Sequence, residues 1–230
     1  MIRESSSATS AFLLLVDGRL PTGGHTHSGG IEVAVADGRV HDLSSLRAYL
    51  QGRLTSSGLV DAAFAAATWR SLAPLGALNA EAHARCASPA LRRASALQGR
   101  GLLRAAHRIW PSSELAELDD LSSVSTVMWP VVLGVVARAA ALSSRDAALA
   151  GAHGSVTCPA WAAVRILGLD PFLVVAILAE LADQVDEIAR RADVAAGSIS
   201  SPEFLPANSS PLIEISAEQH ANWEVRLFVS

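Results

Sequence analysis

The segment that begins at Asp170-Pro171 carries the clearest periodic pattern in the chain. Its apolar residues recur at steps of three or four positions and are Val174, Leu178, Leu181, Val185 and Ile188. This spacing places them on one face of an α-helix. No segment of convincing length alternates apolar and polar residues as a half-buried strand does. We therefore predict an all-α fold, a single-domain bundle of about eight to ten helices.

The composition suits one domain with extensive buried surface. The chain has 230 residues, of which 50% are hydrophobic and 17% charged, and its mean hydropathy is +0.33. This length supports one large core, and so apolar a composition suggests that partner proteins cover part of the surface. We expect a disordered N-terminus over 1–9 and a single domain over 10–230. Within it, 198–230 is expected to be a mobile tail that docks on a partner.

Neither a membrane span nor a secretory signal is predicted. No apolar run reaches the ~20 residues that a spanning helix needs, because Gly134 and Arg138 interrupt the longest candidate, 131–142. The N-terminus is short and polar, and the apolar run 11–16 is too short for a signal peptide. We expect a cytoplasmic protein without membrane association.

The polar residues exclude several kinds of chemistry. All 18 basic residues are arginine, so there is no lysine for a Walker A loop, a Schiff base or a Ser-Lys dyad. No serine lies in a GxSxG elbow, and His83, His107, His153 and His220 stand singly. The net charge of -4 argues against a nucleic-acid partner. We predict a protein that is not an enzyme.

Residues 20–32, LPTGGHTHSGGIE, form the most specific stretch of the chain. Its flexible glycines would let His25 and His27 face one metal ion, although two ligands without a third make a weak site. The glycine amides could instead form an anion nest at the start of the next helix. The glycines could also simply supply positive φ angles in a tight turn between helices. The residues alone leave these three interpretations open.

A long helix is predicted from Ser88-Pro89 to Pro111, with a serine cap and proline at the first turn. One face is apolar and has Gln98 at its centre, and the other carries arginines, namely Arg92, Arg93, Arg100, Arg104 and Arg108. This cationic face is either a binding surface or an ordinary solvated face.

Four dispersed segments resemble the urease accessory protein UreF family. The stretch 20–32 is similar to the family signature, with His25 where an aromatic residue is usual, Thr26 for serine and Ile31 for leucine. The other matches are RRASALQGRGLL at 92–103, GVVAR at 134–138, and the ending PLIEI to RLF over 211–228. The resemblance covers about residues 10–230 in collinear order. A departure lies at Gly168-Leu-Asp-Pro171, where the family has a Pro-Leu-Gly-Gln-like step.

The resemblance implies a non-catalytic all-α homodimer that acts in urease maturation. It would link UreD, also called UreH, and the GTPase UreG to apo-urease and support GTP-dependent nickel insertion. It would bind no cofactor stably, and nickel would be handled by the assembled complex. The alternative is a nickel-binding metallochaperone that uses His25 and His27.

The resemblance also implies where the partners bind. Contacts with the GTPase, or gating of the nickel route, are expected at Pro21, Gly23, Gly24, Ser28 and Glu32 and on the cationic helix at Arg93, Arg100, Arg104 and Arg108. Docking on UreD is expected through Pro211, Leu212, His220, Arg226, Leu227 and Phe228. The dimer region is expected over 128–167, with Arg138 and Arg165.

Overall fold

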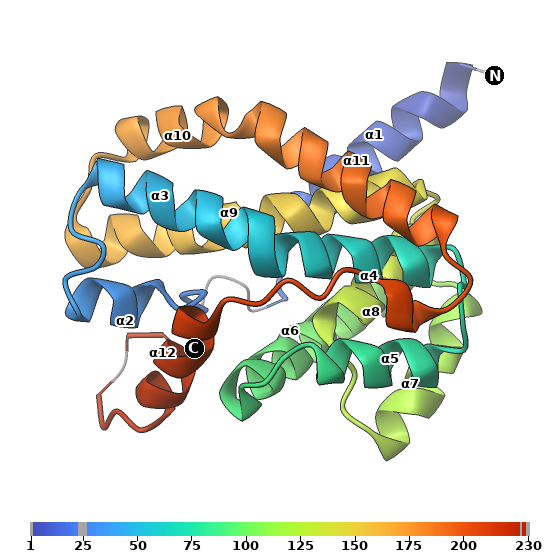
Figure 1. Cartoon of the computed structure of the whole chain (residues 1–230). Helices are drawn as coiled ribbons and strands as arrows, with labels where there is room; N and C mark the ends of the chain where they lie inside the picture. Colours follow the sequence, from blue (N-terminus) through green and yellow to red (C-terminus); the bar gives the residue numbers. More distant parts are fainter. Residues whose placement is uncertain (1, 23–26, 226, 229–230) are drawn as a thin grey trace.

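The computed structural model describes residues 2–22, 27–225 and 227–228. Within them the chain forms helices and no strand, which confirms the all-α prediction (Figure 1). The α-helices are α1 (Ile2–Val16), α2 (Ile31–Ala36), α3 (Leu43–Arg53), α4 (Leu59–Trp69), α5 (Leu75–Ala84), α6 (Pro89–Ile109), α7 (Glu114–Val124), α8 (Trp129–Ala139), α9 (Ser144–Leu167), α10 (Pro171–Glu180), α11 (Ala182–Ser198) and α12 (Pro211–Ala221). A π-helical turn, η2 (Leu54–Gly58), joins α3 to α4, and a 3-10 turn, η3 (Pro202–Phe204), precedes α12.

The number of α-helices is slightly above the eight to ten expected. The segment after Asp170 was expected to be one helix, but it is divided into α10 and α11 at Leu181. The predicted apolar stripe nevertheless faces the core along both helices, since Val174, Leu181, Val185 and Ile188 are buried. A change of helix direction therefore leaves the periodic pattern intact.

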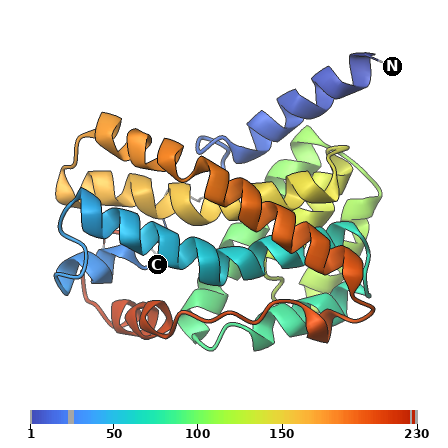
Figure 2. The ribbon, with the colours of Figure 1, turned by 45° about the horizontal axis from the view of Figure 1, so that its top comes forward.

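The N-terminal helix is longer than expected. Residues 1–9 were predicted to be disordered, whereas α1 begins at Ile2. No proline or glycine occurs over 2–9, so nothing in that segment stops the helix. Figure 2 shows α1 projecting away from the body of the molecule toward its N-terminal end.

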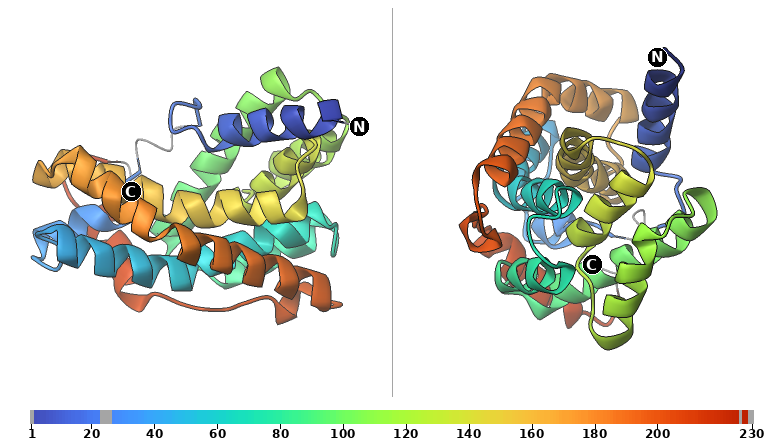
Figure 3. Two further views of the ribbon diagram at one scale, coloured as in Figure 1. Left: turned by 90° about the horizontal axis from the view of Figure 1, so that it is seen from above. Right: turned by 90° about the vertical axis from the view of Figure 1, so that its right-hand side faces the viewer.

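Helix α4 lies at the centre of the bundle and packs against α8, α9 and α11, as the end-on view in Figure 3 shows. Most of its buried side chains are alanine. Small side chains on the neighbouring helices allow a close approach: a Cβ on Gly151 of α9 would lie 3.0 Å from Ala62 Cα. The alanine-rich composition is thus used for tight helix packing.

Helix α9 is continuous, although it contains Gly151, Gly154 and Pro159. Proline has no N–H, so Pro159 cannot donate to the carbonyl of Ser155 one turn earlier. Arg53 of α3 supplies the missing donor, with Nε 2.9 Å from Ser155 O. This contact keeps α9 intact and fixes the Arg53 side chain.

The C-terminal segment, predicted to be a mobile tail, docks on the chain's own body. Arg85 donates hydrogen bonds to the carbonyls of Pro202, Glu203, Leu205 and Pro206 at 2.9–3.2 Å. Beyond this, α12 packs on α2 and α6 (Figure 1). In the described part of the chain, no helix is both long and apolar enough to cross a membrane.

Candidate functional site

The second half of the glycine-rich stretch is held by α3 and α9. The carbonyl of His27 accepts a hydrogen bond from Cys158 Sγ of α9 at 3.0 Å. The carbonyl of Gly29 accepts two, from Tyr49 Oη at 2.8 Å and from Arg53 Nη1 at 2.9 Å, both of α3. Arg53 therefore joins the loop to α9 through two different carbonyls.

Two of the glycines are needed for their backbone conformation. Gly29 and Gly30 have φ angles of +63° and +86°, which favour glycine. A Cβ on Gly30 would also lie 3.0 Å from Tyr49 Oη. These two residues therefore fit the interpretation of the stretch as a tight turn between helices.

The other predicted loop residues differ in accessibility. Pro21 is exposed, whereas Ser28 is fully buried and its Oγ accepts a hydrogen bond from Gly30 N at 3.2 Å. Gly23, Gly24 and His25 lie outside the described residues, so the anion nest and the two-histidine metal site stay predictions. Among the described residues, no group of three His, Cys, Asp or Glu side chains could hold a metal ion.

Glu32 faces the C-terminal tail of its own chain. The residue is 7% exposed, and its carboxylate accepts three hydrogen bonds. One comes from His220 Nε2 at 2.7 Å, and two come from the backbone N–H groups of Leu227 at 2.9 Å and Phe228 at 3.3 Å. A buried carboxylate needs such donors, so Glu32 links the end of the glycine-rich stretch to the tail.

Polar contacts also join α12 to α6 and to the loop after α2. Glu218 accepts hydrogen bonds from Ser88 Oγ at 2.5 Å and from Ala90 N at 2.8 Å, at the N-terminus of α6. The bond from Ser88 is the main cause that lowers the pKa of Glu218. Ser216 Oγ accepts a hydrogen bond from Arg39 Nη2 at 2.7 Å. Helix α12 is thus fixed both to the N-terminus of α6 and to the loop after α2.

The outer face of the tail is apolar. Leu212 and Ile215 of α12 are 64% and 55% exposed, and Leu227 is also exposed. Pro211 is exposed at the start of the helix, and Arg226 lies outside the described residues. The predicted docking segment therefore turns His220 and Phe228 inward and most of its other described residues outward.

The predicted dimer region is largely buried at α8. Residues 130–137 of this helix are buried inside the chain, so α8 could offer a second copy only its ends, at Trp129, Arg138 and Ala139. Arg138 is half-buried and serves an internal contact, an ion pair of 3.1 Å with Glu114. Arg165 is exposed on α9, and its guanidinium lies 4.4 Å from the ring centre of Phe228. The sequence pattern does not distinguish the two cases, because an apolar helix packs equally well within a chain or between chains.

The predicted cationic helix is present and exposed. Arg93, Arg100, Arg104 and Arg108 of α6 all point to solvent, whereas Arg92 turns back to the carbonyls of Cys86 and Ala87. The expected face is thus formed by four of the five arginines.

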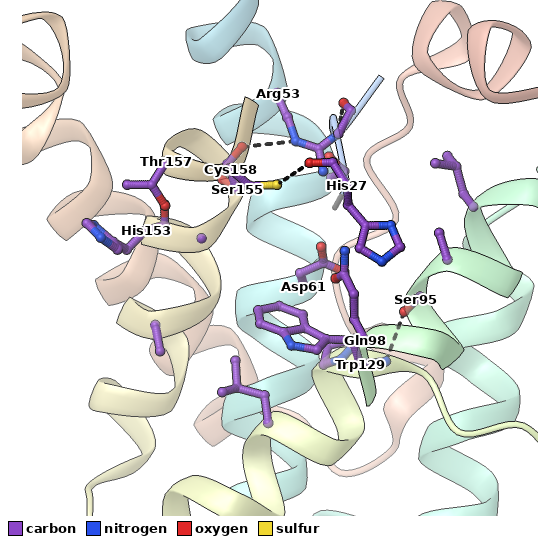
Figure 4. A pocket seen from close by; sticks show the side chains of 18 of the residues that line it. His27, Arg53, Asp61, Ser95, Gln98, Trp129, His153, Ser155, Thr157 and Cys158 are labelled. Carbon is purple, nitrogen blue, oxygen red and sulfur yellow. Dashed lines mark hydrogen bonds between the residues drawn. The ribbon is translucent and has the colours of Figure 1, made fainter. Parts of the chain in front are cut away.

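A cavity of about 660 Å³ lies beneath the glycine-rich stretch, between α3, α4, α6, α8 and α9. Figure 4 shows its lining, which includes the side chains of His27, Arg53, Asp61, Gln98 and Trp129. Gln98 was predicted to be buried in an apolar stripe, and instead it borders this cavity half-buried. The cavity places polar groups from distant parts of the chain around one space.

Asp61 is an acid of the cavity wall that was not predicted from the sequence. Burial raises the pKa of its carboxyl from 3.8 to about 6, and the nearby Arg53 offsets part of that shift. One turn earlier, Ser57 Oγ is buried without a hydrogen-bond partner in the described structure. A single acid within the otherwise uncharged helix 59–69 was the available signal.

The π-helical turn η2 precedes this wall. Gly58 at its end allows α9 to come close, because a Cβ there would lie 3.1 Å from Ser155 Cβ. π-Helical turns are often found at functional sites. Here the turn carries Ser57 and sits between Arg53 and Asp61, all three of which line the cavity.

Three other titratable groups that line the cavity are held in neutral forms by burial. Burial raises the pKa of Cys86 to about 11 and also raises the pKa of Cys158. Burial lowers the pKa of His153, which favours its neutral imidazole. The cavity therefore combines an aspartate of raised pKa with neutral sulfur and imidazole groups, and neither Cys86 nor Cys158 is an activated thiolate.

Comparison with known proteins matches the chain along nearly its whole length. The family model described as UreF matches residues 40–182. The chain is 41% identical over 227 residues to the urease accessory protein UreF of Mycolicibacterium vanbaalenii, which covers 97% of this chain and 100% of that relative. It is 42% identical over 224 residues to the protein of the same name from Mycobacterium marinum, with 96% and 99% covered. For Mycobacterium tuberculosis (strain H37Rv) the identity is 37% over 224 residues, with 97% and 100% covered.

Proposed function

The chain belongs to the UreF family of urease accessory proteins, and on this basis we propose that it is a non-catalytic scaffold for nickel insertion. In this proposal it links UreD, also called UreH, and the GTPase UreG to apo-urease in the cytoplasm. It supports GTP-dependent delivery of nickel to the urease active site, and it holds no cofactor of its own. The cavity beneath the glycine-rich stretch is the observation that carries the proposal.

The size and lining of the cavity suit a metal ion in transit. A divalent ion with six waters needs roughly 200 Å³, at about 30 Å³ for each water, and the cavity holds about 660 Å³. Tight binding of a transition metal needs several ligands at one point. The wall instead offers the separate carboxylates of Asp17, Asp61 and Glu214, and no group of three ligands is found among the described residues, so a hydrated ion would be attracted and then released.

Substitution of Asp61 tests this route. In cells that produce urease with its accessory proteins, Asp61→Asn should lower the nickel content per urease active site severalfold. The amide keeps the size of the side chain and removes its charge. Asp186→Asn, at an exposed position of α11, is the matched control. Normal nickel content with Asp61→Asn would show that the cavity is not the route.

The exposed apolar residues of the tail support docking on UreD. Leu212 and Ile215 face solvent, whereas the polar side chains of α12 hold it to the body of the chain. A double change of these two residues to aspartate should abolish co-purification with UreD. Val194→Asp, on an equally exposed apolar residue of α11, should leave the complex intact. Retention of UreD by the double variant would reject this assignment.

An apolar face of α10 supports the homodimer. Phe172 is 85% exposed, and Leu173 and Val175 beside it are about half exposed. We place the contact between copies here, and not at α8, which is buried. Phe172→Asp should shift the protein from dimer to monomer in light scattering after size exclusion. A dimer that persists in this variant would move the interface elsewhere.

A further inference from the structure

The exposed face of α6 forms one continuous stripe. It consists of Arg93, Leu97, Arg100, Arg104 and Arg108, at steps of four, three, four and four residues. At 1.5 Å per residue the stripe is about 22 Å long. Leu97 lies between Arg93 and Arg100 and is 43% exposed. A solvated face explains the arginines, but it gives no reason for an apolar residue between two of them.

Three acidic residues close to α6 already have other partners. Asp119 of α7 pairs with His107 at 3.0 Å, and Glu114 pairs with Arg138 at 3.1 Å. Glu218 accepts hydrogen bonds at the N-terminus of α6 and interacts with Arg93 only through the electrostatic field. In the part of the chain that the structure describes, no ion pair or hydrogen bond engages the four stripe arginines. The positive charge of the stripe therefore remains available to a partner.

A hollow of about 450 Å³ borders the stripe at Arg100, between α6 and the end of α7. Its floor is apolar and includes Leu103 and Val127, and Val124 at its rim is 81% exposed. Gly99 allows α6 to lie close to the segment after α7, since a Cβ at this position would lie 2.9 Å from the carbonyl oxygen of Val127.

The hollow is suited to an apolar group. The hydroxyls of Ser122 and Ser123 already donate to carbonyls of α7, at 2.9 and 2.7 Å. They have no hydrogen left to offer an anion. An apolar side chain of a partner would fill the hollow, while carboxylates on either side would pair with the arginines.

We propose that the α6 stripe binds an acidic amphipathic helix of the GTPase partner, with an apolar side chain of that helix against Leu97 and the hollow. This rests on the proposed function, which supplies the partner. Carboxylates three and four residues apart on a helix match the spacing of the arginines. Arginine pairs with carboxylates through two parallel hydrogen bonds. A nucleic-acid backbone would use the arginines but leave the apolar side chain of Leu97 uncovered.

Site-specific crosslinking tests the nature of the partner segment. A photo-reactive phenylalanine analogue at position 97 is activated in the complex purified from cells that produce all the maturation proteins. We expect one crosslinked peptide from the GTPase, with at least three carboxylates at helical spacing. A crosslink to UreD, to a second copy of this chain, to nucleic acid or to a segment without carboxylates would overturn the proposal.

Charge reversal tests how much the stripe arginines contribute to binding of the GTPase. The double variant Arg100→Glu, Arg104→Glu should bind the purified GTPase at least about tenfold more weakly, and only the wild type should weaken strongly as salt rises. Arg191→Glu, at an exposed position of α11, is the control and should bind normally. Circular dichroism confirms that each variant is folded.

The outcomes separate this proposal from the broader one. If the wild-type chain binds no GTPase under any of these conditions, the scaffold function fails, and the α6 assignment fails with it. If the wild type binds and the double variant binds equally well, only the α6 assignment is overturned.

Discussion

Helices α4 and α12 both have 11 residues, but they are held in opposite ways. Nine residues of α4 are buried, most of them alanine, and they pack closely against three neighbouring helices. Only four residues of α12 are buried, and its main contacts are hydrogen bonds. When apolar side chains of α4 lose their contacts, they become exposed to water, which is unfavourable. When a hydrogen bond of α12 breaks, water can form hydrogen bonds with the freed groups and recover much of the lost energy. The stability of the fold therefore depends on α4, and α12 is suited to exchange contacts with partners.

The largest effect is expected where α8 crosses α4. A Cβ on Gly134 would collide with the carbonyl oxygen of Ala65 and with Thr68 Cβ. Gly134→Ala should therefore lower the free energy of unfolding by about 2–3 kcal/mol, because the helices must separate. Urea denaturation measures this change.

Gly52→Ala in α3 is the control for that prediction. Nothing lies within 4 Å of a Cβ at this position, so alanine should stabilise the helix by about 0.5–1 kcal/mol. An equal response of the two variants would show that the packing around α4 is looser than the structure indicates.

The second-largest change in stability is expected for Asp61, the single acidic residue of α4. Burial raises the pKa of Asp61 to about 6 in the folded chain, against an ordinary value of 3.8 for an aspartate in water. The folded state then holds the proton more tightly than the unfolded state, so wild-type stability falls as pH rises from about 4 to about 6. Asp61→Asn removes this penalty, and should be more stable than wild type by about 1–3 kcal/mol above pH 6.

Urea denaturation at a series of pH values measures the difference. The two proteins should converge near pH 4, where the carboxyl is largely protonated in the folded state and close to half protonated in the unfolded state. A variant Asp61→Asn that is less stable than wild type at every pH would contradict the assigned burial. Stability gained together with nickel delivery lost would show that the acid is kept in α4 for function.

The contrast between the two helices also shows which features of the structure could be predicted from the sequence. Helical periodicity identified the fold class and the face of α10 and α11 that includes Val174 and Ile188, because burial of one helix face is a local pattern. The arginine face of α6 was found for the same reason. These features depend on residues only three or four positions apart.

The contacts that build the site depend on residues far apart. Glu32 and His220 are separated by 188 positions, and Arg53 reaches Ser155 over 102. No local pattern could pair them. The sequence analysis accordingly treated Glu32 as a group presented to partners and the tail as mobile, whereas the structure joins the two.

The smallest effect is expected at this junction. Glu32→Gln replaces one acceptor oxygen with an NH2 group, so at least one of the donors from His220, Leu227 and Phe228 loses its partner. The loss of one hydrogen bond, about 1 kcal/mol, should fall on the tail alone. Amide hydrogen exchange over 211–228 should quicken about fivefold to tenfold, while exchange in α4 stays unchanged.

Glu224→Gln is the matched control, since Glu224 is exposed at the surface of the same segment. It should leave exchange in the tail as in the wild type. If Glu32→Gln instead speeds exchange in α4 and in the tail equally, the two helices unfold together. The tail would then unfold cooperatively with the bundle, although polar contacts hold it in place.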